Sequence, residues 1–224
     1  MDALLKKTTC QRQRVQLWTR ALLAGCMLVT GAASATNFPV SGTISVNGNP
    51  GALPSGGTFG DSTYNTATGD ISVGMFTFPQ STTTFFSQSV GANVTVTYQL
   101  SQTNTSSGQV AGDGTAALTQ VQLKLKAISA VVGVVPVGFG ETCIFQPIVL
   151  DLAGTGDATG LDLGSSGFAI PQVGPTDCSG FGSQVNSGIA GSNNSIQVHM
   201  DGDFTAPTSD LIFANGFEVP GRAG

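Results

Sequence analysis

The chain has 224 residues, of which only 9% are charged. Five of its eight Lys and Arg lie in the first 35 residues, so residues 36–224 have three cations against twelve acids, a net charge of −9. Nucleic acids and anionic membrane surfaces are bound by clustered cations. Residues 36–224 have no such cluster, which excludes both as expected partners. They also have no apolar run that approaches the roughly 20 residues of a membrane-spanning helix, so we expect no transmembrane helix in the mature chain.

The first 35 residues have the composition of an export signal. Five basic residues precede an almost wholly apolar run over residues 21–33, and the sequence Ala-Ser-Ala at 33–35 provides the small side chains that a signal peptidase requires. This pattern predicts a signal peptide over residues 1–35, cleaved between Ala35 and Thr36. We therefore expect the mature protein in the periplasm, at the cell surface or outside the cell.

A second interpretation of the same segment concerns Cys26. The residues Leu-Ala-Gly-Cys at 23–26 fit a lipobox, in which Cys26 is acylated and lipid chains anchor the protein. Only five residues separate Arg20 from Cys26, whereas the apolar run continues past Cys26 toward Ala35. The sequence favours secretion over a lipid anchor, and mass spectrometry of the mature N-terminus distinguishes the two.

Cys143 and Cys178 are the only cysteines after residue 35. An exported chain meets an oxidising environment, in which an even pair is expected to form a disulfide. Neither cysteine has a Cys or His neighbour at zinc-ligand spacing, and neither lies among basic residues that would activate a thiolate. We therefore predict a Cys143–Cys178 disulfide rather than a metal site or a catalytic thiol.

Alternation of polar and apolar residues with a period of two dominates residues 36–205, which we expect to form one domain. The alternation is clearest at Val94–Leu100 and Val121–Ala127, where Thr, Gln and Lys occupy the polar face. Because helical periodicity is nearly absent, the predicted fold class is all-β, an antiparallel β-sandwich with one short helix and one disulfide. The other predicted strands are Val40–Val46, Ile71–Phe78, Thr142–Leu152, Gly160–Ile170 and Ser195–Phe204.

Two further segments complete the expected domain. Phe181, Val185 and Ile189 recur at helical spacing before Gly191, which predicts the short helix. Pro50–Gly69 is rich in Gly, Ser and Thr, and this composition predicts an exposed loop between two strands.

The second half of the chain contains a series of turn and core residues. In chain order they are Cys143 with Pro147, Ile148, Leu150 and Leu152, then Gly160-Leu161, Phe168-Ala169-Ile170-Pro171, Asp177-Cys178, Ala190-Gly191 and Asn194-Ser195-Ile196. This set resembles the C-terminal half of secreted bacterial β-rich (β-sandwich) modules of unknown function. The resemblance implies a β-rich fold and the Cys143–Cys178 disulfide. It implies no catalytic residue.

Residues 206–224 are predicted to be a linker and a C-terminal tail. Asp210–Glu218 follows Pro and Thr residues and resembles a short tail found on exported proteins of Gram-negative bacteria. The resemblance implies a sorting or surface-assembly tag, and the alternative is a terminal strand that covers a sheet edge. Deletion of residues 210–224 separates the two, because loss of a packed strand lowers stability but leaves export unchanged.

His199 is the only histidine of the chain. His199, Asp201 and Asp203 are two residues apart, so they share one face of a predicted strand. This arrangement suits a metal site or a general base oriented by a carboxylate. The interpretation that we favour is an exposed strand face ending in an Asp-Gly-Asp turn. The Gly-x-Ser-x-Gly elbow of serine hydrolases is missing, and the sequence predicts no catalytic residue and no enzymatic activity.

Three more aspartates, Asp151, Asp157 and Asp162, lie in and beside the Gly-rich stretch 153–160. Carboxylates on flexible loops are the ligands that calcium prefers, although these three do not follow EF-hand spacing. We predict no cofactor, with calcium as the alternative. A fall in melting temperature on adding a chelator would reveal bound calcium.

Several apolar segments fit either the centre of a packed core, which is the interpretation that we favour, or the walls of a cavity for an apolar ligand. The segments and residues concerned are Val131–Val137, Ile144–Leu150, Phe76, Phe78, Phe85 and Phe86.

The function that the sequence favours is an exported structural or interaction module, whose Ser, Thr, Asn and Gln faces contact an envelope or extracellular protein or a polysaccharide. The alternative is a carrier of a lipid or another apolar ligand, which requires an internal cavity. The third interpretation is a hydrolase or metal-dependent enzyme, which requires a cleft that gathers His199 with acids from other strands.

Overall fold

The computed structural model describes residues 35–87 and 91–208, and these ranges form twelve strands, a 3-10 helix η1 and an α-helix α2. The predicted signal peptide up to residue 34, Cys26 and the tail from residue 209 lie outside the described residues, whereas Thr36, the expected mature N-terminus, begins β1. The elements are β1 (Thr36–Val46), β2 (Asn49–Ala52), β3 (Gly57–Ser62), β4 (Asp70–Thr77), β5 (Ser81–Ser87), β6 (Ala92–Gln102), β7 (Ser106–Val110), β8 (Thr115–Val132), β9 (Val135–Gly138), β10 (Ile144–Gly156), β11 (Gly160–Ser166), η1 (Cys178–Gly180), α2 (Gly182–Ile189) and β12 (Ser195–Asp201).

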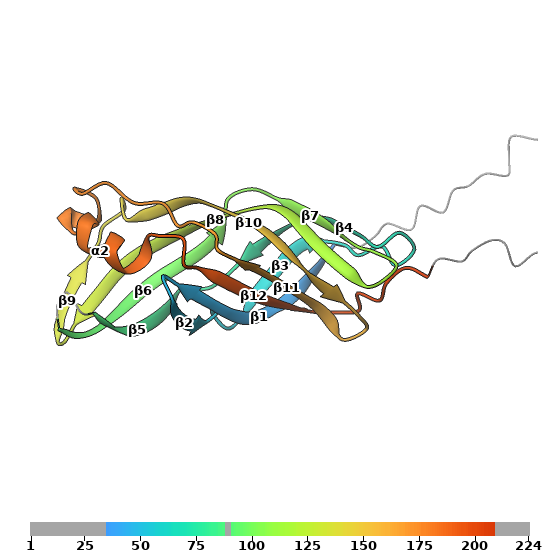
Figure 1. Cartoon of the computed structure of the whole chain (residues 1–224), viewed down its shortest axis with the longest axis horizontal. Helices are drawn as coiled ribbons and strands as arrows, with labels where there is room; N and C mark the ends of the chain where they lie inside the picture. The colour runs from blue at the N-terminus through green and yellow to red at the C-terminus, as the bar shows by residue number, and fades with distance from the viewer. Residues whose placement is uncertain (1–34, 88–90, 209–224) are drawn as a thin grey trace, which may run out of the picture. The chain divides into compact units, whose positions relative to one another are not determined.

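All of these strands belong to one antiparallel sheet that closes on itself (Figure 1). Neighbours pair in the order β10, β11, β12, β1, β3, β4, β7 and β8, and β8 pairs with β10 again, which closes an eight-strand barrel. The all-β class, the short helix and the disulfide are confirmed, whereas the predicted β-sandwich is wrong. Alternation tells which side of a strand is buried, and a sandwich and a barrel bury the same side. The two folds differ in that the barrel has an unbroken ring of paired strands, which β8 and β10 close.

The long strand β8 divides the sheet into two regions. Its first half pairs with β7 on one side and with β10 on the other, inside the closed barrel. From Leu123 onward β6 takes the place of β7, and from Ser129 onward β9 takes the place of β10. We call the second region, made of β5, β6, β9 and residues 123–132 of β8, the open end. Figure 1 shows α2 at this end of the sheet.

The burial of side chains confirms the alternation that the sequence predicts. In the predicted strand Val94–Leu100 the inward positions are at most 8% exposed, and in Val121–Ala127 at most 5%. Lys124 and Lys126 lie between the buried positions of β8 and are partly exposed on the outer face. The inward faces of these strands form one continuous hydrophobic core with the other walls of the barrel.

The predicted exposed loop Pro50–Gly69 is wrong, because it contains β3 and most of β2. Phe59 in β3 is fully buried and packs against Phe76, with ring centroids 4.8 Å apart. A side chain at Gly74 would lie 2.5 Å from the Phe59 ring, so glycine makes room for the ring. Glycine within a strand often marks such a close approach. Within β3 itself, Gly57 and Gly60 interrupt the alternation on which the prediction depended.

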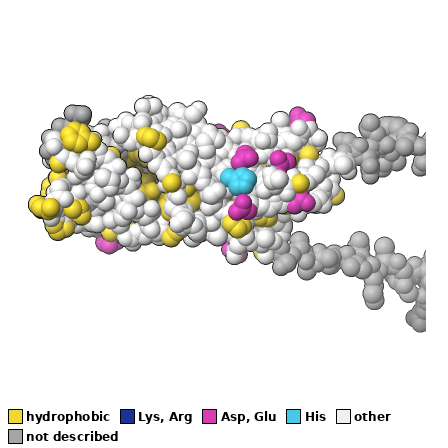
Figure 2. Space-filling model, turned by 90° about the horizontal axis from the view of Figure 1, so that it is seen from below, with side chains coloured by type: hydrophobic (Ala, Val, Ile, Leu, Met, Phe, Trp, Pro, Cys, Tyr) yellow, Lys and Arg dark blue, Asp and Glu magenta, His cyan; other side chains and the backbone are white. Residues whose placement is uncertain are grey.

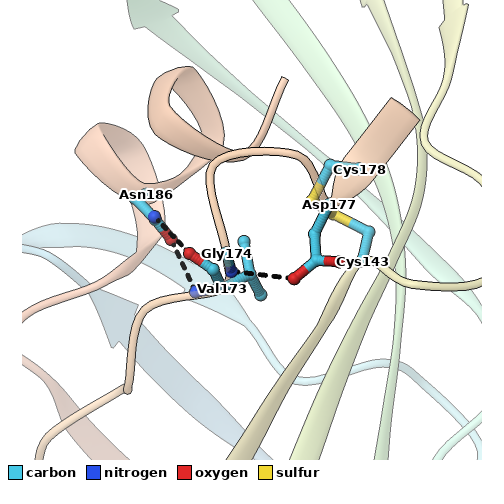
Figure 3. Close-up of a disulfide and its surroundings, with 6 residues drawn as sticks. All are labelled: Cys143, Val173, Gly174, Asp177, Cys178 and Asn186. Carbon is cyan, nitrogen blue, oxygen red and sulfur yellow. Dashed lines mark hydrogen bonds between the residues drawn. A yellow bond between two sulfur atoms is a disulfide. The ribbon is translucent and has the colours of Figure 1, made fainter. Parts of the chain in front are cut away.

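The predicted disulfide and helix lie at the open end (Figure 3). The sulfur atoms of Cys143 and Cys178 are bonded, and both residues are fully buried. The bond joins the chain just before β10 to η1, which immediately precedes α2. As the spacing predicts, α2 packs on the sheet through Val185 and Ile189.

Polar contacts hold the segment before α2 against the helix. The Asn186 side chain accepts the Val173 N–H at 3.0 Å and donates to the Val173 carbonyl at 2.9 Å. The Asp177 carboxylate accepts the Gly174 N–H at 2.8 Å, as Figure 3 shows. Together with the disulfide, these contacts fix α2 over the open end.

Candidate functional site

His199 lies on the outer face of the barrel, between two carboxylates. The register of β11 and β12 places Asp162 opposite His199, and Nδ1 of the ring lies 2.7 Å from Asp162 Oδ1. Nε2 lies 3.3 Å from Asp201 Oδ1. In Figure 2 the histidine, drawn in cyan, has acidic side chains on both sides. The structure therefore gathers His199 with one predicted neighbour, Asp201, and with one residue predicted for a separate calcium site, Asp162.

This geometry suits an ion pair between the protonated ring and the two carboxylates. The hydrogen bond to Asp162 raises the pKa of His199 above its ordinary 6.5, and the nearby Asp201 carboxylate acts in the same direction. A general base needs one ring nitrogen that faces the substrate, whereas both nitrogens of His199 contact carboxylates of this chain. The arrangement suits an imidazolium that ties β11 to β12.

The other aspartates predicted as metal ligands have different surroundings. Asp157 Oδ1 accepts the backbone N–H and the hydroxyl of Thr159, at 2.7 and 2.6 Å. Asp203 caps Thr205 in the same way. These contacts lower the pKa of Asp157 and of Asp203. Within residues 35–87 and 91–208, no group of three or more His, Cys, Asp or Glu side chains is placed to hold a metal ion.

Asp151 and Asp162 share a polar hollow on the outer face of β10 and β11. Its volume is about 510 Å³, it is widely open to solvent, and Gln197 and Ser166 also line it. Amide, hydroxyl and carboxylate groups on an open surface suit hydrogen bonding to a polar partner.

A second kind of site lies under α2 at the open end. A cavity of about 330 Å³ lies between the helix and strands β5, β6, β8 and β9, and a smaller one of about 80 Å³ adjoins it. The two cavities share Phe85, Val96, Gly188 and Ile189 as lining residues, and we refer to them together as the α2 cavity. The larger part is lined mainly by apolar side chains, among them Phe85, Val94, Val132, Val137, Phe139 and Ile189.

The sequence predicted only part of this lining. Phe85 and Val137 line the α2 cavity, as the cavity hypothesis requires. Phe76 and Phe78 instead belong to the packed core, being 3% and 2% exposed, and Phe86 is 55% exposed. Of these predicted residues, Phe76 and Phe78 thus belong to the core, whereas Phe85 and Val137 line a cavity.

The missed lining residue with the clearest sequence signal is Gly188. It follows Val185 by three positions, so both lie on the face of α2 that packs on the sheet. The position that a Cβ atom of residue 188 would occupy is 3.7 Å from the Phe85 ring. A glycine on the buried face of an otherwise regular helix leaves space that a larger side chain would fill.

Large hydrophobic side chains are exposed on several elements at the open end. Val134 at the tip of the β8–β9 hairpin is 92% exposed, and Val135 beside it is 59% exposed. Phe86, Phe181 and Val131 are each at least 40% exposed. Figure 2 shows hydrophobic side chains gathered at the end where Figure 1 places α2 and β9. We call these five residues the apolar rim.

In comparisons with known proteins, no family model, no curated protein and no solved structure matches this chain. The resemblance to secreted bacterial modules thus stays a prediction. In the part of the chain that the structure describes, no helix has both the length and the apolar character to cross a membrane.

Proposed function

We propose that this protein is a non-catalytic binding module that holds a small apolar ligand in the α2 cavity. The observation that supports the proposal is an apolar cavity of about 330 Å³ that opens to the surface at one end of an otherwise packed barrel. Ligand sites in proteins are mostly apolar hollows of ~300–1,000 Å³ with a few polar groups. Gln184 and Ser187 of α2 are such groups at the cavity wall.

The packing around the α2 cavity supports the proposal further. Val94, Val96 and Ile189 are 6–8% exposed, although they belong to the core cluster. All three line the α2 cavity, so a ligand there would bury apolar surface that folding alone leaves uncovered. The free energy gained by burying this surface would favour an apolar ligand over a polar one.

Replacement of Gly188 tests the proposal, with the neutral dye Nile red as the probe. Wild-type protein is expected to bind the dye with an increase in fluorescence. Gly188→Leu projects a side chain into the α2 cavity and should weaken dye binding at least about tenfold. It should also raise the free energy of unfolding by about 1 kcal/mol, because leucine favours the helix over glycine.

A matched control keeps the test specific. Ser183→Leu adds the same side chain to α2 at an exposed position outside the cavity lining. It should leave dye binding unchanged. Equal dye binding by wild type and Gly188→Leu would contradict the proposal, because the dye would then bind elsewhere, for example on the apolar rim.

The apolar rim favours a second candidate function, the predicted interaction module. A two-residue hairpin turn usually has Gly, Asn or Asp at its tip, whereas here Val134 follows Gly133 and is 92% exposed. Large exposed apolar side chains gathered at one end of a molecule often mark contact surfaces. The candidate partner is an extracellular or envelope protein with an apolar surface. Val134→Asn with Phe86→Ser should abolish co-purification of this partner yet leave Nile red bound in the α2 cavity, because neither residue lines the cavity.

We further propose that the module acts after export. The support is the signal-like composition of residues 1–35 together with a buried disulfide, a bond typical of oxidising compartments. Mass spectrometry of the mature protein should find Thr36 at the N-terminus. An acylated Cys26 would instead favour the lipid-anchored alternative, and an intact N-terminus would contradict both.

A further inference from the structure

The lining of the α2 cavity has no formal charge. Its polar members are the hydroxyls of Thr83, Thr84 and Ser187, the amides of Asn49 and Gln184, and the Tyr98 phenol. Burial raises the pKa of Tyr98, which keeps the phenol neutral at physiological pH. These groups can hydrogen-bond to a hydroxyl or an ester, but they provide no counter-ion for an acid.

Because side chains alternate along β8, the two lysines of this strand lie on the outer face of the sheet. Leu125 lines the smaller part of the α2 cavity, whereas its neighbours Lys124 and Lys126 point away from the core. Lys126 moreover forms an ion pair with Glu141. In residues 35–87 and 91–208 these are the two basic residues besides His199.

The third group that can carry a positive charge, His199, also points away from the core. His199 alternates with the buried residues Val198 and Met200, so its ring lies on the outer face, between Asp162 and Asp201. Residues 36–224 also have a net charge of −9, which repels anions at long range. An anionic ligand would therefore lose hydration at the α2 cavity without gaining an opposite charge.

We propose that the α2 cavity selects uncharged ligands, namely alkyl chains that end in a hydroxyl or an ester, and rejects the ionised fatty acid of the same length. This inference rests on the proposed function and adds the chemical class of the ligand. The apolar wall accommodates the chain, and neutral donors and acceptors at its edge, such as Gln184 and Ser187, accommodate the head group.

Competition for Nile red tests this selectivity at pH 8, where a fatty acid is ionised. Dodecanol and dodecanoate share one alkyl chain and differ in the charge of the head group. Dodecanol is expected to displace the dye at a concentration at least about tenfold lower than dodecanoate. Gly188→Leu is the control for displacement from the α2 cavity, because it should bind neither the dye nor the alcohol.

A cation placed at the cavity wall should reverse the selectivity. Gln184→Lys adds a positive charge to an exposed residue of the lining and should strengthen dodecanoate binding about tenfold. Gln197→Lys changes the net charge equally but lies in the polar hollow on the outer face. It should leave dodecanoate binding nearly unchanged, since salt screens charges that are far apart.

Three outcomes would overturn the inferred selectivity, and they differ in whether the proposed function is overturned with it. Equal displacement by dodecanol and dodecanoate would overturn the selectivity and leave the proposed function intact. Displacement by neither ligand would overturn the proposed function and the selectivity with it. An equal gain from Gln197→Lys and Gln184→Lys would also overturn the inference, because net charge rather than the lining would then control binding.

Discussion

The closed barrel and the open end have the same pattern of alternating side chains, yet only the closed barrel has an interior filled with packed side chains. In the closed barrel Phe59, Leu118 and Leu150 are at most 1% exposed. At the open end the inward residues Val94 and Val96 are 8% and 6% exposed, and they border the α2 cavity. In the barrel, hydrogen-bonded strands complete the wall on every side, so side chains from opposite walls meet. At the open end a short helix covers the gap.

The contrast shows that alternation and cavity formation are controlled separately. Alternation decides which side of each strand is apolar. Whether the apolar sides contact one another depends on what covers them, and α2 covers the open end with Gly188 beside the Phe85 ring. A small residue on a covering helix thus leaves a hollow that the strands themselves do not encode.

The largest effect should come from truncating the core of the closed barrel. Phe59→Ala is expected to lower the free energy of unfolding by about 3–5 kcal/mol, because it removes a fully buried ring and leaves a cavity. Urea denaturation followed by circular dichroism measures the change. Phe86→Ala at the open end is the matched control, and its effect should stay near 0.5 kcal/mol, since that ring is 55% exposed. Similar losses in both variants would contradict the distinction between the two regions.

Removal of the disulfide should have the next largest effect. The Cys143–Cys178 bond closes a loop over a sequence separation of 35 residues. Replacing both cysteines by alanine should cost about 2–4 kcal/mol. Hydrogen exchange followed by mass spectrometry should show the greatest loss of protection in α2 rather than in β3. A uniform loss across both elements would mean that the bond does not hold α2 in particular.

The smallest effect should be the pH dependence of the His199 ion pair. The folded-state pKa of His199 is raised, so its stabilising contribution is complete below the unfolded pKa of about 6.5 and is lost as the pH rises through the raised value. The melting temperature of wild type should exceed that of His199→Asn at pH 6, by no more than about 3 °C for an exposed pair. The difference should vanish at pH 9.

Asp162→Asn provides the control for this last prediction. It removes the carboxylate that lies 2.7 Å from Nδ1 and should reproduce most of the effect of His199→Asn at pH 6. A difference between wild type and His199→Asn that grows with pH would contradict the ion-pair interpretation. Loss of an enzymatic activity in either variant would instead favour the third interpretation, a hydrolase or metal-dependent enzyme that uses His199.

Local chemistry in the sequence was enough to predict the strands with clear polar faces, the helix near Phe181–Ile189 and the Cys143–Cys178 bond. Period-two and helical spacing are properties of neighbouring residues, and two cysteines allow one pairing. The strand β5 consists mostly of Ser and Thr, β7 has the short sequence Ser-Ser-Gly-Gln-Val, and β3 is interrupted by Gly60, so the same method failed there. In these strands the surrounding barrel rather than local pattern provides the stabilisation.

For the candidate sites, the sequence by itself determined which residue types were present: one histidine, few cations and several apolar segments. It paired His199 with Asp201 correctly but could not bring in Asp162, which lies 37 positions away and is aligned only by the β11–β12 register. Closure of the sheet, the α2 cavity and the apolar rim were likewise decided by the tertiary structure alone. Each depends on contacts between segments far apart in the chain, and the alternation of neighbouring residues holds no information about which distant strand or helix will lie opposite.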